Sequence, residues 1–107
     1  MPREIMGLPY KHPAVILNVI SVTLIAFNIA VRTGLHVSSG THPLYLTMAG
    51  SVIVAAMALY ALSQSSKAGV IVGYVLTAEH FFAGVVLGLS AISYFTGPGS
   101  ILWHLSH

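Results

Sequence analysis

Three long apolar segments, joined by short polar links, are the feature that most constrains the fold of this chain. They cover about residues 13–32, 44–63 and 69–95. A helix of about 20 apolar residues crosses a hydrocarbon core of roughly 30 Å. Only 6% of the residues are charged, against roughly 25% in a soluble domain, so a soluble fold could not cover its surface. The sequence therefore predicts an all-α integral membrane protein, a single domain over residues 1–107 with three transmembrane helices.

The polar links predict how the three spans are connected. The link at residues 64–68 is so short that the last two spans are expected to form an antiparallel helical hairpin. A Gly-Pro-Gly sequence at residues 97–99 ends the third span. The tail at residues 100–107 contains Trp103 and is expected to lie in the membrane interface.

The basic residues predict an orientation in the membrane. Arg3, Lys11 and Lys67 lie on the side of the N-terminus and the second link, whereas Arg32 lies on the other side. Because positive residues favour the cytoplasmic side, we expect a cytoplasmic or stromal N-terminus and a C-terminus on the opposite side. The host membrane is expected to be a plasma or thylakoid membrane.

Several function classes lack the residues that they need. Four basic residues spread along the chain make no patch, which excludes nucleic-acid binding. The chain has no cysteine for a thiolate metal site. Glu4 and Glu79 are its only acidic side chains, so few residues could act as a general acid or base in catalysis. We therefore expect that the chain is not an enzyme by itself, although it could be a subunit of an enzyme complex.

The third span carries two polar residues near the middle of the bilayer, Glu79 and His80. A charge at this depth costs about 2.5–3.5 kcal/mol or more, so each residue needs a partner or a role. His80 belongs to a stripe of mostly small residues at three- and four-residue steps: Gly73, Thr77, His80, Gly84, Gly88 and Ala91. The Gly84-x-x-x-Gly88 spacing allows close helix approach. His80 is thus expected in a helix–helix face or beside a flat cofactor, with Glu79 about 100° around the helix.

The residues alone leave three interpretations of this pair open. His80 could ligate a metal centre, and chlorophyll magnesium would fit because one axial ligand suffices. Alternatively, His80 hydrogen-bonds across helices, to Asn28 for example, while Glu79 is neutral or paired with another subunit. Glu79 could also serve a proton path in a homo-oligomer. Asn28 and Asn18 are expected to stabilise helix packing through their amides, with contacts to a pigment or quinone as the alternative.

Four other histidines are predicted to share one side of the membrane. His36 and His42 lie in the first loop, and His104 and His107 lie near the C-terminus. Imidazole suits copper or zinc, so these four residues are a candidate metal site. No carboxylate joins them, and the alternative is that they are ordinary interfacial residues.

The third span resembles two families of small photosystem I subunits. The sequence Glu79-His80-Phe-Phe-Ala-Gly-Val-Val-Leu-Gly-Leu-Ser90 is similar to the second span of the subunit K family, and Asn28 with Arg32 is similar to its first span. Thr77-Ala78-Glu79, followed by Phe81 to Phe95, resembles the last span of the subunit L family. The subunit K family has two spans, whereas this sequence predicts three. The resemblance implies a peripheral subunit that binds chlorophyll and carotenoid, with His80 as a magnesium ligand.

The sequence thus predicts a non-catalytic accessory subunit of a multi-subunit, energy-converting membrane complex. Its expected partners are other membrane subunits of a hetero-oligomer and lipids. The complex could be a pigment-binding photosystem, which is a photosynthetic electron-transfer complex. One alternative is an accessory subunit that stabilises a respiratory or copper-dependent monooxygenase complex. Another is a homo-oligomeric channel or carrier that uses Glu79.

Overall fold

The computed structural model describes residues 4–5, 8–9, 11–35, 44–64 and 66–96. This part of the chain contains three long helices: α1 (Pro13–Gly34), α2 (Leu44–Ser63) and α3 (Lys67–Thr96). Two short strands, β1 (Glu4–Ile5) and β2 (Leu8–Pro9), pair antiparallel ahead of α1. Each helix is long and apolar enough to cross a membrane. The prediction of an all-α chain with three such helices is therefore confirmed, and the two small strands are an addition to it.

The helix bounds differ from the predicted spans by at most two residues. The first helix extends to Gly34, the second matches its predicted range, and the third extends from Lys67 to Thr96. The predicted interfacial tail at residues 100–107 lies outside the described residues.

Local chemistry explains where α1 and α3 begin. Pro13 occupies the first helical position of α1, where its missing N–H group removes no hydrogen bond. The His12 side chain caps this end, because its Nδ1 accepts the Ala14 N–H at 3.1 Å. Ser66 has the same role before α3, where its hydroxyl oxygen accepts the Gly69 N–H at 3.0 Å.

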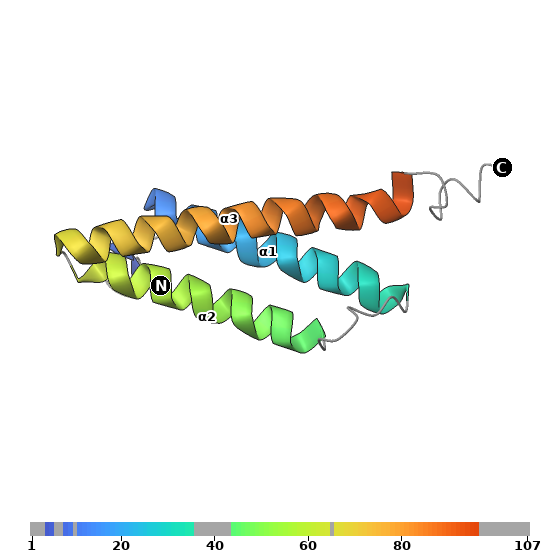
Figure 1. The fold of residues 1–107 in the computed structure, drawn as a ribbon, viewed down its shortest axis with the longest axis horizontal. Helices are drawn as coiled ribbons and strands as arrows, with labels where there is room; N and C mark the ends of the chain where they lie inside the picture. Colours follow the sequence, from blue (N-terminus) through green and yellow to red (C-terminus); the bar gives the residue numbers. More distant parts are fainter. Residues whose placement is uncertain (1–3, 6–7, 10, 36–43, 65, 97–107) are drawn as a thin grey trace.

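Helix α3 lies against both of the other helices (Figure 1). Towards α2, Gly69 approaches Ala61, and Gly73 approaches Leu62 and the Ala58 carbonyl oxygen. Towards α1, Gly84 meets Ser21 and Gly88 meets Leu24, so that residue numbers rise along both helices. Helix α3 is thus the element that connects the bundle.

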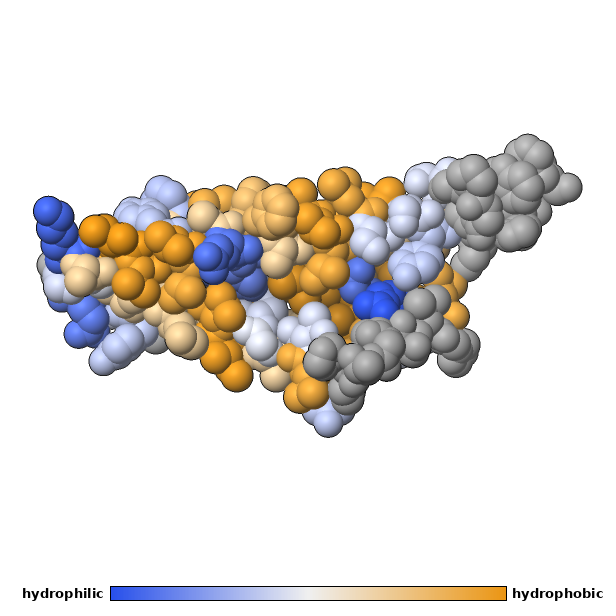
Figure 2. Space-filling model, viewed as in Figure 1, coloured by the Kyte–Doolittle hydropathy of each residue, from blue (hydrophilic) through white to orange (hydrophobic). Residues whose placement is uncertain are grey.

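On α3, small and polar side chains face the interior and the largest apolar side chains face outward. The buried residues of α3 are Gly73, Thr77, His80, Gly84, Gly88 and Ala91. By contrast, Phe82 and Leu89 of the same helix are 71% and 62% exposed. Figure 2 shows the resulting surface, which is apolar over much of the length of the helices. Such a surface suits lipid or other helices as its surroundings.

Candidate functional site

His80 lies at the centre of a buried polar cluster that joins the three helices. Its side chain comes from α3 and is only 4% exposed. Its Nε2 atom lies 2.7 Å from the Ser51 hydroxyl oxygen of α2. Its Nδ1 atom lies 2.8 Å from the Asn18 Oδ1 atom of α1. One imidazole ring therefore holds a hydrogen bond to each of the other two helices.

The Asn18 amide has one orientation that satisfies all its neighbours. Its Nδ2 group donates to the Ala14 carbonyl oxygen at 2.8 Å and to the Thr77 hydroxyl oxygen at 3.0 Å. The Thr77 hydroxyl in turn donates to the Gly73 carbonyl oxygen at 2.8 Å. A flipped amide would place two oxygen acceptors face to face at Ala14. Asn18 must therefore present Oδ1 to His80.

This orientation fixes the tautomer of His80. An amide oxygen only accepts hydrogen bonds, so the proton of the neutral ring lies on Nδ1 and is donated to Asn18. The lone pair of Nε2 then accepts the Ser51 hydroxyl proton. The result is a directional chain of donors from Ser51 through His80, Asn18 and Thr77 to the Gly73 carbonyl. In an apolar interior, a fully satisfied chain of this kind is stabilising and specific.

A chlorophyll magnesium does not fit His80 in this arrangement. The Nε2 lone pair that would bind the metal is already occupied by the Ser51 hydroxyl. The glycines of the stripe, which could have offered a flat cofactor space, contact helices instead. A Cβ atom on Gly84 would lie 3.0 Å from the Ser21 Cα atom, and one on Gly73 would lie 2.9 Å from the Ala58 carbonyl oxygen. Ligation would require the His80–Ser51 bond to break and the helices to separate.

Gly84 and Gly88, which were predicted to pack against a neighbouring helix, face α1 of the same chain. A Cβ atom on Gly84 would also approach the Ser21 carbonyl oxygen at 3.2 Å, and one on Gly88 would lie 3.1 Å from the Leu24 Cδ2 atom. Only residues without a side chain allow α1 and α3 to come this close.

Asn28 was predicted as an example of a partner for His80, but Asn18 holds that position in the structure. Asn28 is also buried, and its Nδ2 group donates to the Leu87 carbonyl oxygen of α3 at 2.9 Å. The reason for the difference is the offset of α1 along α3. Asn28 lies ten residues after Asn18 in α1, about 15 Å farther along the helix.

Ser51 was not among the site residues predicted from the sequence, and no bond between Thr77 and Asn18 was predicted. A signal for Ser51 was present, because Ser51 and His80 lie at similar distances from the short link between α2 and α3. Folding the chain at that link brings these two residues to the same level. Thr77 precedes His80 by three residues and therefore shares its face of the helix.

Glu79 is exposed, whereas His80, the next residue, is buried. Its side chain lies on the exposed surface of α3, so it takes no part in the packing of the three helices. Within the described part of the chain, it has neither a hydrogen-bond partner nor an ion-pair partner.

The four histidines of the candidate metal site, His36, His42, His104 and His107, lie outside the described residues. Among the residues that are described, no group of three or more histidines or carboxylates could hold a metal ion.

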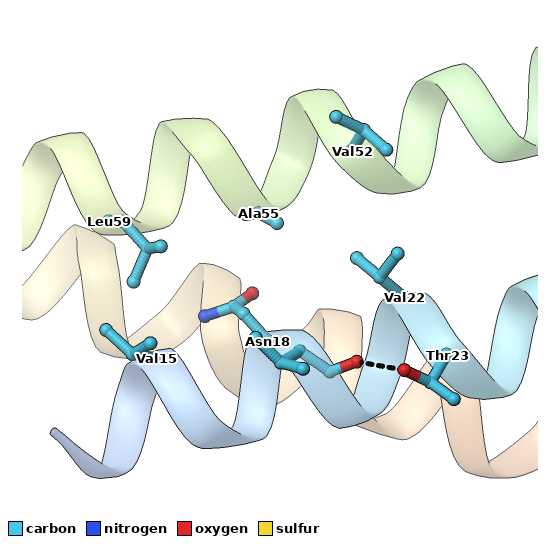
Figure 3. A pocket seen from close by; sticks show the side chains of 8 residues that line it. Val15, Asn18, Val22, Thr23, Val52, Ala55 and Leu59 are labelled. Carbon is cyan, nitrogen blue, oxygen red and sulfur yellow. Dashed lines mark hydrogen bonds between the residues drawn. The ribbon is translucent and has the colours of Figure 1, made fainter. Parts of the chain in front are cut away.

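An apolar groove of about 260 Å³ lies between α1 and α2 (Figure 3). The Thr23 hydroxyl at its edge donates to the Val19 carbonyl oxygen at 2.8 Å, and Asn18 is committed to the buried cluster. The groove therefore offers carbon surfaces to an occupant, from Val15, Val19, Val22, Val52, Ala55 and Leu59.

Comparisons of this chain with protein families, with curated proteins and with solved structures find no match.

Proposed function

We propose that this chain is a non-catalytic accessory subunit of a multi-subunit membrane complex. In this proposal α1, α2 and α3 cross the bilayer, and α2 with α3 forms an antiparallel hairpin. The observation that carries the proposal is the use of both ring nitrogens of His80 to hold three helices together. The most reactive group in the described interior thereby has a structural role.

The distribution of side chains supports a role in assembly. The interior is closed by the small residues of α3, by buried apolar side chains of α1 and α2 such as Val15 and Leu59, and by the polar cluster, which leaves little room for a substrate. The groove between α1 and α2 offers apolar walls that suit a lipid acyl chain or the polyene chain of a carotenoid. The outer surface carries large apolar side chains together with Glu79, a residue that needs a partner at this depth.

The class of complex follows from the sequence and from the role of His80. An energy-converting complex is our expectation from the resemblance to small photosystem I subunits. If His80 has a structural role, it does not ligate a pigment. A subunit without a pigment ligand at His80 also fits a respiratory or copper-dependent monooxygenase complex. Chlorophyll, if bound, would then use a ligand other than His80.

The orientation remains part of the proposal. Lys11 precedes α1, and Lys67 begins α3 at the same end of the bundle, where the His12 and Tyr74 rings stack. Arg32 lies near the opposite end of α1. This distribution supports a cytoplasmic or stromal N-terminus and a C-terminus on the other side.

The test is to purify the chain from its native membrane in a mild detergent and to record the absorption spectrum of what accompanies it. We expect the chain to migrate with other membrane subunits, far above its own mass of 11.3 kDa. A red chlorophyll band would identify a photosystem, and haem or copper absorption would identify a respiratory or monooxygenase complex. A chain that migrates alone, or only with copies of itself, would contradict the proposal.

A further inference from the structure

Glu79 lies deep within the longest helix and on its outer side. It is roughly three turns or more from either end of α3. The next residue, His80, is bonded to Ser51 and Asn18 inside the bundle, which places Glu79 level with the interior of α1 and α2. If α3 spans the bilayer, the Glu79 carboxyl group lies within the hydrocarbon region.

The surface around Glu79 provides no polar group to satisfy it. The neighbours one turn away on its face are Val75, which is 51% exposed, and Phe82, which is 71% exposed. Figure 2 shows that hydrophilic atoms interrupt an otherwise apolar surface partway along α3. A carboxylate left in this position costs about 2.5–3.5 kcal/mol or more, so intramembrane carboxylates almost always face protein or water and have a partner.

A second copy of this chain cannot supply the partner. Copies in one membrane share an orientation, and closed symmetry brings equal depths together. At the depth of Glu79, the outward residues beside Asn18 and Ser51 are apolar: Val19, Ile20, Val52 and Ile53. Of the described cations, Lys67 lies three turns away along α3, Lys11 lies seven residues before Asn18 and ahead of α1, and Arg32 lies nearly four turns beyond Asn18. A second copy would therefore offer Glu79 either a carbon surface or another carboxyl group.

We infer that the outer face of α3, at Val75, Glu79 and Phe82, binds a transmembrane helix of a different chain that carries a lysine or arginine at the depth of Glu79. This inference rests on the proposed function and names the chemistry of the partner. Charge complementarity selects a cation, because opposite charges in a low-dielectric region attract strongly and this attraction offsets part of the cost of burying each of them. The exposed valine and phenylalanine side chains on either side provide the apolar contact.

The test uses the full chain in phosphatidylcholine vesicles with synthetic leucine–alanine helices as probes. One probe carries a single lysine at its centre, a second carries it two turns from the centre, and a third carries none. Resonance energy transfer between dyes on the chain and on the probe measures association. We expect the central-lysine probe to bind at least about tenfold more tightly than the apolar probe, and Glu79→Gln to abolish this difference.

Glu79→Gln is the matched variant, because it keeps the size and polarity of the side chain and removes only its charge. Equal binding of the three probes, or an unchanged preference in Glu79→Gln, would overturn the inference. Energy transfer between copies of the chain that exceeds transfer to the central-lysine probe would also overturn it, because the occupant would then be a second copy.

Purification from native membranes separates this inference from the proposed function. Loss of the partner subunits in Glu79→Gln alone would support both. Retention of the complex by both the wild-type chain and Glu79→Gln would overturn the inference and leave the accessory role intact. A wild-type chain that migrates alone would contradict the accessory role, and the vesicle experiment would still decide the chemistry of the α3 face.

Discussion

The polar residues on the two sides of α3 have opposite surroundings. On the inner side, His80 is 4% exposed and has a partner for each ring nitrogen. On the outer side, the adjacent Glu79 is exposed and, in the part of the chain that the structure describes, has no partner. The inner side also carries glycines that contact α1, whereas the outer side carries Phe82 and Leu89.

This difference separates what holds the chain together from what it offers to its surroundings. A polar group in hydrocarbon must be satisfied, and helix packing in a membrane depends on close contact and hydrogen bonds because lipid is as apolar as the side chains. The inner side of α3 provides both the close contacts and the hydrogen bonds within one chain. If α3 spans a bilayer as proposed, the carboxyl group of Glu79 on the outer side would have to be satisfied by another molecule.

The largest expected effect comes from enlarging a side chain on the inner side. Gly84→Leu would place atoms where the Ser21 backbone lies, because even a Cβ atom would be 3.0 Å from its Cα atom. We expect the helices to be forced apart and the free energy of unfolding to fall by about 3 kcal/mol. Unfolding in mixed detergent micelles, followed by circular dichroism, measures the change.

Ala78→Leu is the matched control for this substitution on the outer side. Ala78 is also a small residue of α3, and its side chain is exposed. We expect its replacement to change the free energy of unfolding by less than about 0.5 kcal/mol. Equal losses at positions 78 and 84 would show that the two sides do not differ in packing as described.

The inner side of α3 was largely predictable from the sequence, because it depends on helical periodicity. The predicted stripe from Gly73 to Ala91 consists of the same residues that the structure buries on α3. A three- and four-residue spacing of small residues defines a face from one helix alone. The three helices were predictable for a similar reason, since length and hydropathy are local properties.

The partners of His80 were not predictable, because they depend on how far each helix is shifted along its neighbours. The rings of His12 and Tyr74 stack with centroids 6.3 Å apart, so α1 begins about two turns into α3. This shift brings Asn18, and not Asn28, to the level of His80. Nothing in the apolar spans themselves determines such an offset.

The next prediction uses the two asparagines of α1 to measure the polar cluster. Asn18→Ala removes the bonds to His80 and Thr77 and leaves the Nδ1 proton of His80 without an acceptor. We expect a loss of about 2 kcal/mol in the free energy of unfolding. Asn28→Ala should cost about 0.6 kcal/mol, because Asn28 makes one bond to a helical carbonyl that keeps its own helix bond. Similar losses in the two variants would argue against a central role for the cluster.

A smaller effect is expected for the bond between α2 and α3. A double-mutant cycle with Ser51→Ala and His80→Leu isolates the 2.7 Å interaction between these side chains. We expect a coupling energy of about 0.6 kcal/mol, which is typical of interhelical hydrogen bonds in membranes, and at most about 1.7 kcal/mol. A coupling energy of zero would mean that Ser51 does not use the Nε2 lone pair, which would then be available for a metal.

The smallest expected effect on the isolated chain is that of substituting Glu79. This substitution is the sharpest test of the difference between the inner and outer sides of α3. Glu79→Gln changes a residue that contacts neither α1 nor α2 through a hydrogen bond or ion pair. The free energy of unfolding in micelles should therefore shift by less than about 0.5 kcal/mol, whereas His80→Gln, one residue away, should destabilise the chain by breaking bonds to two helices. A large loss in Glu79→Gln would place its carboxyl group inside the bundle. An unchanged stability would leave Glu79 free to act on a partner, so that its effect would be measured only in the assembled complex.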